Sequence, residues 1–392
     1  MQLVLLSGGS GKRLCPLSNN VRSKQFLPLL EKEDGTIESM VQRVVRQAKA
    51  AGLTNAITLA TNTSQLDIIT NQLGDTVSVV TEPECRDTFP AIALAASYLH
   101  FAKCCADDEV IVIMPCDPYT EADYFETIGK MVECVKRDVA ELVLMGITPT
   151  YPSEKYGYVM PIASDNEYKM VSYFTEKPTV ERAKELLAEN AYWNGGVFAF
   201  RLGYMMNIVK KYIALNSFED TRNRYSELPK ISFDYEVAEK AESVAVVPFA
   251  GEWKDLGTWN TLTNELHKSV FGNAVMGAHC ENTYVINEFQ NPIYVNGLKD
   301  VLVAACPDGI LVCSKTHLEE IKKAVENLIS RPMCGRWGIY RVLDDSTYEG
   351  GQHSFTKSIT LNSGKNISYR FITTVQRFGL SYKAKVFLSL MA

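Results

Sequence analysis

The sequence predicts an α/β protein, in which a Rossmann-like, doubly wound mixed sheet is followed by a small β-rich, β-solenoid-like domain. Short apolar runs alternate with longer amphipathic runs over residues 2–147, as in a sheet that carries helices on its faces. Three glycines follow the first apolar run. From residue 273 the chain changes to short strands separated by turn signals. The length of 392 residues predicts two or three domains.

The N-terminal alternation sets the expected elements in order. Apolar runs predict strands over 2–6, 55–60, 77–81, 109–114 and 142–147. The amphipathic runs between them predict helices over 37–51, 64–73, 89–103 and 121–139, begun by the N-caps Thr36, Ser64, Thr88 and Thr120. After Pro149, short strands and one helix at 179–190 predict an insertion that covers the open edge of the sheet.

The C-terminal part predicts two further units. Residues 273–315 contain strands of four to six residues with a turn signal between each, which indicates a separate β-domain. Residues 317–331 predict a closing helix, and Pro332 marks its end. We therefore expect domains at 1–265 and 273–331, followed by a poorly patterned tail at 332–392.

Composition excludes several classes of protein. The net charge of -6 argues against a broad nucleic-acid-binding face. None of the ten cysteines forms a C-x-x-C pair, so we expect buried thiols in a reducing cytoplasm rather than a zinc ribbon. No signal peptide and no apolar run of ~20 residues stands out, which predicts a cytoplasmic protein that does not bind membranes.

The segment LSGGSGKRLCPLS, residues 6–18, leaves the first strand through glycines and meets two cations. It is not a P-loop, because Arg13 stands where Ser or Thr is required, and it also lacks the dinucleotide-binding spacing. One interpretation is an anion cradle of backbone N–H groups, with Lys12 and Arg13 at its exit and Lys24 close by in sequence. The alternative is a tight turn with solvated cations.

Several motifs together resemble a known family. GGSGKRLCPLS and KQFLPL resemble the signature of sugar-1-phosphate nucleotidylyltransferases, and EPECRDTFPAIALAA is similar to their mannose-1-phosphate guanylyltransferase branch. MPCDPY, YGYVMP, FTEKP, WNGGVFAF and WKDLGTWN continue the resemblance in order over residues 2–265. The resemblance implies transfer of GMP from GTP to α-D-mannose 1-phosphate, which gives GDP-mannose and pyrophosphate. Such a reaction needs positioning and charge neutralisation but no protein nucleophile.

Two carboxylates are the candidate metal ligands. Asp117 ends an apolar strand at the carboxyl edge of the predicted sheet, where open α/β sheets bind ligands, and Asp255 lies in WKDLGTW. A separated pair of this kind suits Mg2+ shared with substrate phosphates. Alternatively, Asp117 caps a turn and Asp255 makes a buried hydrogen bond. Arg13 suits the leaving pyrophosphate, and Lys24 would lie nearer the α-phosphate.

The resemblance also implies two substrate subsites. The nucleotide-binding residues are Leu6, Ser7, Gly8, Gly9, Gly11, Lys12, Glu82, Arg86, Asp87, Thr88 and Pro115. A guanine pocket needs acceptors, preferably a carboxylate, although Thr88 could instead only cap a helix. The sugar-phosphate residues are Tyr156, Gly157, Glu176, Lys177, Asn194 and Gly195, with Lys177 on the phosphate and Glu176 on the hydroxyls. The structural alternative is surface and strand turns.

The tail resembles, at 336–345 and 357–370, the entry into a cupin-type phosphomannose isomerase domain, where a His-rich metal-binding run should follow. Instead, residues 372–381 read ITTVQRFGLS, which codons for HHHRSEVWTF can spell when read one base late. We therefore expect a truncated cupin without an isomerase metal site.

Three alternative functions stay open. A different hexose-1-phosphate nucleotidylyltransferase would differ in nucleotide and sugar preference. A non-catalytic sugar-nucleotide sensor would keep the pocket, and an NAD-linked oxidoreductase fits the alternation but lacks G-x-G-x-x-G. The expected partners are GTP, mannose 1-phosphate and a second copy of the chain in a homodimer.

Overall fold

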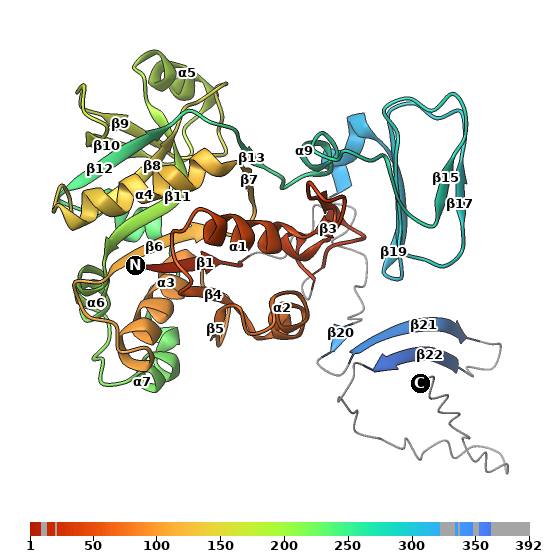
Figure 1. Ribbon diagram of the computed structural model, residues 1–392, viewed down its shortest axis with the longest axis horizontal. Coiled ribbons are helices and arrows are strands. Elements are labelled where there is room, and N and C mark those ends of the chain that lie inside the picture. Colours follow the sequence, from red (N-terminus) through yellow and green to blue (C-terminus); the bar gives the residue numbers. More distant parts are fainter. Residues whose placement is uncertain (9–13, 20–21, 322–333, 336–337, 348–352, 362–392) are drawn as a thin grey trace, which may run out of the picture.

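The computed structural model describes residues 1–8, 14–19, 22–321, 334–335, 338–347 and 353–361. Its centre is a nine-stranded mixed sheet with the order β5-β4-β1-β6-β11-β8-β12-β10-β9. These strands span Gln2–Leu6 (β1), Ile57–Asn62 (β4), Ser78–Glu82 (β5), Val110–Pro115 (β6), Leu142–Ile147 (β8), Tyr158–Pro161 (β9), Lys169–Thr175 (β10), Tyr192–Arg201 (β11) and Val244–Phe249 (β12). Helices lie on both faces of the sheet (Figure 1).

The N-terminal half of the sheet is parallel, because β1 pairs in parallel with β4 and β6, and β4 pairs in parallel with β5. Alternate side chains of β1 enter different cores. Leu3 and Leu5 pack into one hydrophobic cluster, whereas Val4 packs into the cluster on the opposite face. A strand buried on both faces reads as a continuous apolar run, which is why the sequence located β1 correctly. The predicted α/β, doubly wound mixed sheet is confirmed.

The predicted insertion after Pro149 does not lie over the edge of the sheet. Strands β9, β10 and β11 join the sheet itself, and β11 runs antiparallel between β6 and β8. The prediction failed because short runs broken by Gly and Pro favour strands but do not identify their partners. As a result, the motifs YGYVMP and WNGGVFAF are placed in neighbouring strands, since β11 also pairs with β9.

Helices cover the two faces of the sheet. The helices α1, α2, α4 and α5 contribute to the core that contains Leu3, whereas α3, α6 and α8 contribute to the core that contains Val4. The helices span Met40–Ala50 (α1), Leu66–Leu73 (α2), Thr88–Ser97 (α3, continued by a π-helical turn at Tyr98–Ala102), Ala122–Lys136 (α4), Val180–Ala188 (α5), Leu202–Val209 (α6), Phe218–Asn223 (α7), Phe233–Glu236 (α8) and Trp259–Thr263 (α9).

All four predicted N-caps are wrong by one to three residues. Ser39 caps α1 in a capping box with Gln42, and Asp87 caps α3. The predicted caps have other contacts: Thr36 donates to the Asp34 carboxylate, the Thr88 hydroxyl accepts from the Phe233 amide, and Thr120 belongs to a strand. A 3-10 turn at Thr63–Gln65 precedes α2, with Asn62 as its cap, so Ser64 is not the cap either. Runs of neighbouring polar residues offer several equivalent caps, and tertiary contacts select among them.

Short ribbons connect the sheet to its loops. The segment after β1 leads through a 3-10 turn at Lys24–Phe26 to β2 (Leu30–Glu31) and β3 (Ile37–Glu38). Strand β7 (Pro118–Thr120) pairs with β13 (Trp253–Asp255) as a separate two-stranded ribbon. Two further 3-10 turns lie at Tyr225–Glu227 and Ala238–Lys240.

A second body of β structure follows α9, and we call residues 270–321 the β-unit. Its strands span Val270–Gly272 (β14), Ala274–Met276 (β15), Tyr284–Asn287 (β16), Ile293–Val295 (β17), Val301–Cys306 (β18) and Gly309–Ser314 (β19), followed by a 3-10 turn at Lys315–Glu320. Strands β14, β16 and β18 pair in parallel, as β15 does with β17, which is the stacking expected of a β-solenoid. The predicted closing helix lies largely outside the described residues.

The β-unit shares a hydrophobic core with the N-terminal region, although Figure 1 shows its strands to one side of the helices and sheet. Leu302 and Ala304 of β18 pack in one cluster with Leu14, Leu256 and Trp259. These side chains are fully buried. The two parts are therefore joined by a continuous apolar contact.

The described part of the tail contains one small sheet. Strands β20 (Cys334–Gly335), β21 (Gly338–Thr347) and β22 (His353–Leu361) form an antiparallel sheet. The frame-shifted run at 372–381 lies outside the described residues, so its interpretation remains a sequence prediction. Within the described ranges, no helix combines the length and apolar character needed to cross a membrane.

Candidate functional site

A cavity of about 370 Å3 opens at the carboxyl ends of β1, β5 and β6. Nine of the residues predicted from the sequence line it: Leu6, Ser7, Gly8, Glu82, Arg86, Asp87, Thr88, Pro115 and Asp117. The sequence did not predict the other lining residues, which are Ala60, Cys85, Ala91, Gly196, Phe198 and Asp234. The location agrees with the rule that open α/β sheets bind ligands at the carboxyl edge.

Of the two candidate metal ligands, Asp117 lines the cavity and Asp255 does not, and the two share a cation. Lys24 Nζ lies 2.8 Å from Asp117 Oδ2 and 2.9 Å from Asp255 Oδ1. Burial opposes the charge on Lys24, but the two carboxylates outweigh burial and raise the pKa of Lys24. Lys24 therefore stays protonated, and the two carboxylates hold its ammonium group in position. Asp255 is 39% exposed and accepts a partly buried hydrogen bond from Lys24, so the alternative of a structural hydrogen bond for this residue stays open.

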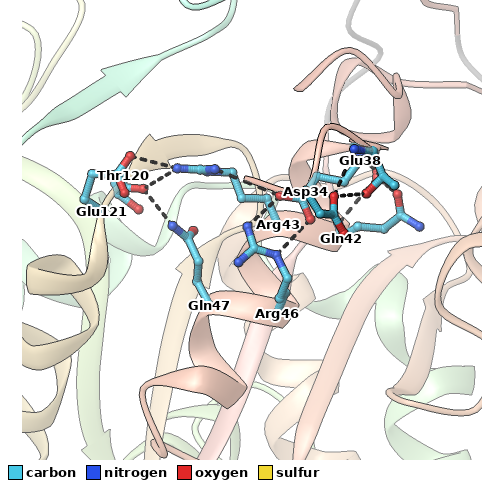
Figure 2. Close-up of polar contacts among 10 residues, drawn as sticks. Asp34, Glu38, Gln42, Arg43, Arg46, Gln47, Thr120 and Glu121 are labelled. Carbon is cyan, nitrogen blue, oxygen red and sulfur yellow. Dashed lines mark hydrogen bonds and ion pairs between the residues drawn. The ribbon is translucent and has the colours of Figure 1, made fainter. Parts of the chain in front are cut away.

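The ribbon of β7 and β13 carries both acids, because Asp117 directly precedes β7 and Asp255 is paired with Pro118. Helix α1 holds this ribbon (Figure 2). Arg43 Nη2 donates to the Thr120 carbonyl at 3.3 Å and to Glu121 Oε1 at 2.8 Å, and Gln47 Nε2 donates to the same carbonyl at 3.0 Å.

Two further contacts define the surroundings of Arg43. Its guanidinium lies 4.5 Å from the centre of the Tyr119 ring, an aromatic side chain of β7. The neighbouring Arg46 instead makes a bidentate contact with Glu38, which is buried in β3 (Figure 2). Arg43 thus contacts the ribbon that carries the acids and also lies 4.0 Å from Glu38, whereas Arg46 contacts Glu38 through both carboxylate oxygens.

A buried polar network underlies the start of the Gly-rich turn. Gln65 Oε1 accepts from the hydroxyls of Ser7 at 3.1 Å and Thr61 at 2.6 Å, and its Nε2 donates to Ser23 Oγ at 2.6 Å. Gln25 Nε2 donates to Ser7 Oγ at 2.8 Å. The network therefore joins the cavity wall at Ser7 to both neighbours of Lys24. A lone Gln in a polar stretch carries no sequence signal for this role.

Glu82 is a buried carboxylate in the cavity wall. The Tyr225 hydroxyl donates to Glu82 Oε2 at 2.6 Å. Burial raises the pKa of Glu82, and the hydrogen bond from Tyr225 partly offsets this rise. Tyr225, which the sequence did not predict, thus fixes one oxygen of a carboxylate that lines the cavity.

The turn from β5 into α3 is held by specific contacts. Asp87 has a φ of 77°, a left-handed conformation that Asp tolerates, and its carboxylate accepts from the Thr88 amide at 2.7 Å. Arg86 Nη2 donates to the Leu228 carbonyl at 3.1 Å. The Thr88 hydroxyl accepts from the Phe233 amide at 2.8 Å, so the alternative in which Thr88 is the helix cap is wrong.

The predicted sugar-phosphate residues gather around two acids. Lys177 Nζ lies 2.7 Å from Glu176 Oε1, and a Cβ on Gly157 would displace Glu176 Oε2 and the Phe174 ring. The hydrogen bond to Glu176 raises the pKa of Lys177. Asn194 Nδ2 donates to Asp234 Oδ1 at 2.5 Å. Burial, reinforced by Glu176, raises the pKa of Asp234 to about 6.

The remaining sugar-site residues have structural contacts. The Tyr156 ring packs against Trp193 and Trp253, at centroid distances of 4.9 and 5.3 Å. A Cβ on Gly195 would lie 3.1 Å from Ile147, so Gly195 allows close packing on β8. This packing role differs from the strand turns that the structural alternative predicted for the glycines of WNGGVF. Four predicted residues, Gly9, Gly11, Lys12 and Arg13, lie outside the described residues.

The two carboxylates beside Lys24 are the candidate ligands for a divalent cation. Among the described residues, no group of three or more His, Cys, Asp or Glu side chains could hold a metal ion. Asp117 and Asp255, however, each direct one oxygen to Lys24, and their side chains are 29% and 39% exposed. Two partly exposed carboxylates, one of which lines the cavity, fit Mg2+, which completes its shell with water and substrate oxygens.

This fold and this cavity define a class of protein. The profile of the family described as nucleotidyl transferase matches residues 2–269, so the chain belongs to the nucleotidyl transferase family. The predicted family resemblance is thus confirmed for the class of enzyme.

Individual relatives are more specific. The chain is 29% identical over 404 residues to the mannose-1-phosphate guanylyltransferase of Escherichia coli, and 29% identical over 400 residues to the xanthan biosynthesis protein XanB of Xanthomonas campestris. Both alignments cover 93% of this chain and 82% of the relative. A crystal structure described as mannose-1-phosphate geranyltransferase from Thermus thermophilus matches with a TM-score of 0.67 and 28% identity, over 83% of this chain and 98% of that one.

Proposed function

We propose that the chain transfers GMP from GTP to α-D-mannose 1-phosphate and releases GDP-mannose and pyrophosphate. The observation that carries the proposal is a cavity at the carboxyl edge of the sheet that Glu82 and Asp117 line, with Asp117 linked through Lys24 to Asp255. The family membership supports nucleotidyl transfer. The relatives named mannose-1-phosphate guanylyltransferase support the choice of GTP and mannose 1-phosphate.

The reaction is a single displacement at the α-phosphorus. An oxygen of the sugar phosphate forms the new P–O bond, and the bond between the α-phosphorus and the bridging oxygen of the β-phosphate breaks. Pyrophosphate leaves with that electron pair. Lys24 balances the growing negative charge with an ammonium that its two acids hold in place. Asp117 and Asp255 would hold Mg2+, which supplies charge neutralisation and orients the phosphates when bound.

The base subsite lies at Glu82. A buried carboxylate accepts the N1–H and the exocyclic amine of guanine, which adenine and the pyrimidines do not present on one edge. Tyr225 fixes one carboxylate oxygen, so the Glu82 side chain has a defined orientation before the nucleotide binds. Arg86, Asp87 and Thr88 shape the wall beside it, and Leu6, Ser7, Gly8 and Pro115 form the floor.

The sugar subsite lies at Glu176, Asn194 and Asp234. These side chains offer acceptors and an amide for hydroxyl groups, and the Asn194–Asp234 hydrogen bond orients both. Lys177 contacts the phosphate of the incoming sugar, while Tyr156, Gly157 and Gly195 shape the space around it. In the same proposal Gly9, Gly11 and Lys12 bind the triphosphate, and Arg13 binds the leaving pyrophosphate.

Three further expectations from the sequence belong to the proposal. The domains are divided at 1–265, 273–331 and 332–392. The enzyme acts in the cytoplasm, apart from nucleic acid and membranes. Two copies form a homodimer, which the mass in solution measured by light scattering tests.

A pyrophosphate-release assay tests the function. GTP, ATP, UTP and dTTP are each paired with mannose 1-phosphate, glucose 1-phosphate and galactose 1-phosphate, and the product is identified by mass spectrometry. We expect GTP with mannose 1-phosphate to react fastest and to give GDP-mannose. Equal turnover of the four nucleotides would remove the guanine subsite from the proposal, and no release with any pair would favour a sensor.

A further inference from the structure

The segment 14–27 follows the Gly-rich turn and contains Lys24, and several of its described residues contact the β-unit. Leu14 and Leu17 are fully buried in the cluster that they share with Leu302 and Ala304 of β18. The Cys306 thiol, at the end of β18, donates to the Pro16 carbonyl at 3.2 Å. The β-unit therefore contacts a segment of the catalytic site itself.

Two polar contacts tie the same segment to acids of the β-unit. Arg22 makes a bidentate contact with Glu288, with Nη1–Oε2 and Nη2–Oε1 distances of 2.9 and 2.5 Å. Asn19 Nδ2 donates to Asp308 Oδ2 at 2.6 Å. The Asn19 side chain also accepts from the Arg22 amide at 2.8 Å, so the two contacts are joined within the segment.

The geometry of these contacts favours a positioning role. Arg22 and Glu288 are 23% and 30% exposed, and a bidentate guanidinium–carboxylate pair fixes direction as well as distance. Lys268 and Glu31 form another ion pair between the β-unit's flank and the N-terminal region, but Lys268 is 52% exposed and makes a single contact. A single exposed pair is weakly directional.

The opposite side of the segment is held by the catalytic body. Ser23, next to Arg22 in sequence, accepts from Gln65 in the buried network that also contains Ser7. The segment is thus fixed between Gln65 on one side and Glu288 and Asp308 on the other. Lys24 follows directly.

We infer that Glu288 and Asp308 of the β-unit are positioning residues for the nucleotide, acting through Asn19 and Arg22 on the segment that joins the Gly-rich turn to Lys24. The inference rests on the proposed function for the identity of the nucleotide. It assigns the β-unit a part in GTP binding, although none of the β-unit's residues line the described cavity. The sugar subsite, at Glu176 and Asn194, lies on other elements of the chain and is not expected to respond.

Glu288→Gln, Asp308→Asn and the double Arg22→Gln/Glu288→Gln test the inference, with Lys268→Gln as the matched control. Hydrogen exchange of peptide 14–27 is measured without ligand, the GTP Kd by calorimetry with Mg2+, and the KM of mannose 1-phosphate by pyrophosphate release. We expect Glu288→Gln to speed exchange and to raise the GTP Kd about five- to tenfold, with less than about a twofold change in the sugar-phosphate KM. Lys268→Gln should match the wild type.

The double variant checks for direct coupling. If Arg22 and Glu288 act as a pair, the double variant should be no worse than Glu288→Gln alone. A double variant that is worse than Glu288→Gln, or exchange and GTP affinity unchanged in both Glu288→Gln and Asp308→Asn, would overturn the inference. Should one of these variants not fold, Arg22→Lys, which keeps the charge and loses the bidentate contact, gives the same comparison. The proposed function fails separately, if the wild type binds GTP but forms no GDP-mannose.

Discussion

Replacing Lys24 with methionine removes the ammonium that Asp117 and Asp255 share and keeps most of the apolar stem. The two contacts, at 2.8 and 2.9 Å, are partly buried: Lys24 is 17% exposed, and the acids are 29% and 39% exposed. Removing one partner of a fully buried pair costs about 3–5 kcal/mol, and the exposure of the acids reduces this to about 2 kcal/mol. At about 2–4 °C per kcal/mol, Tm should fall by about 4–8 °C without divalent ions.

Magnesium should restore part of that loss. Without the ammonium, the two acids repel each other and gain more from a divalent cation than in the wild type, so Mg2+ should raise the Tm of the variant more. Thermal unfolding over a Mg2+ titration measures this. Lys254→Met is the matched control, because Lys254 lies on the same ribbon but pairs with Glu252 and Glu265. An equal Mg2+ effect on the wild type and on Lys24→Met would refute the assignment of the acids as the metal site.

Three further changes have defined outcomes. Tyr225→Phe removes the donor to Glu82 and should lower the free energy of unfolding by about 1–3 kcal/mol in chemical denaturation. The same variant should raise the KM of GTP but not that of mannose 1-phosphate. Asp234 has a pKa of about 6 in the folded protein against an ordinary value of 3.8. Protonated Asp234 therefore stabilises the folded state at low pH, and this contribution is lost as the pH rises from about 4 to about 6. In the Asp234→Asn variant, Tm should change less with pH over this range. Arg43→Met should lower kcat about tenfold or more through displacement of the acids, whereas Arg46→Met should leave kcat near the wild-type value.

Each of these expectations has an opposing result. A Tyr225→Phe variant with an unchanged KM for GTP would separate Glu82 from the base subsite. A Tm that rises between about pH 4 and 6 through Asp234 would contradict the sign, because the folded state keeps a proton there that the unfolded state has released. Equal losses of kcat in Arg43→Met and Arg46→Met would indicate a general effect on α1 instead of a specific hold on the ribbon.

The sequence located the parts of the site that directly follow buried strands. Asp117 was predictable because an apolar strand ends two residues before it, whereas Glu82, the last residue of β5, was predicted from the family resemblance and the need for a carboxylate acceptor. Asp234 was not, since it lies in a helix of four residues and enters the cavity only through tertiary packing. The ionic link of Lys24 to Asp255 likewise spans 231 residues, a contact that local pattern does not encode.

The fold, like the site, was predictable only in part from the sequence. Continuous apolar runs identify strands buried on both faces, and the parallel half of the sheet follows from them. Strand β11 was visible as a strand but not as the antiparallel partner of β6, because periodicity defines which residues face a core and leaves the neighbour undefined. The N-caps failed for a related reason: Ser39 and Thr36 are chemically equivalent candidates until the preceding strand is placed.

The apolar cluster shared by the two bodies sets a limit on dissection of this polypeptide. Excision of everything after residue 265 would uncover Leu14, Leu256 and Trp259, three side chains that have no access to water in the intact chain. An exposed apolar surface of that kind is prone to self-association. The N-terminal domain should therefore be obtainable only together with the β-unit. Any recombination of these two parts during evolution would have had to transfer both together.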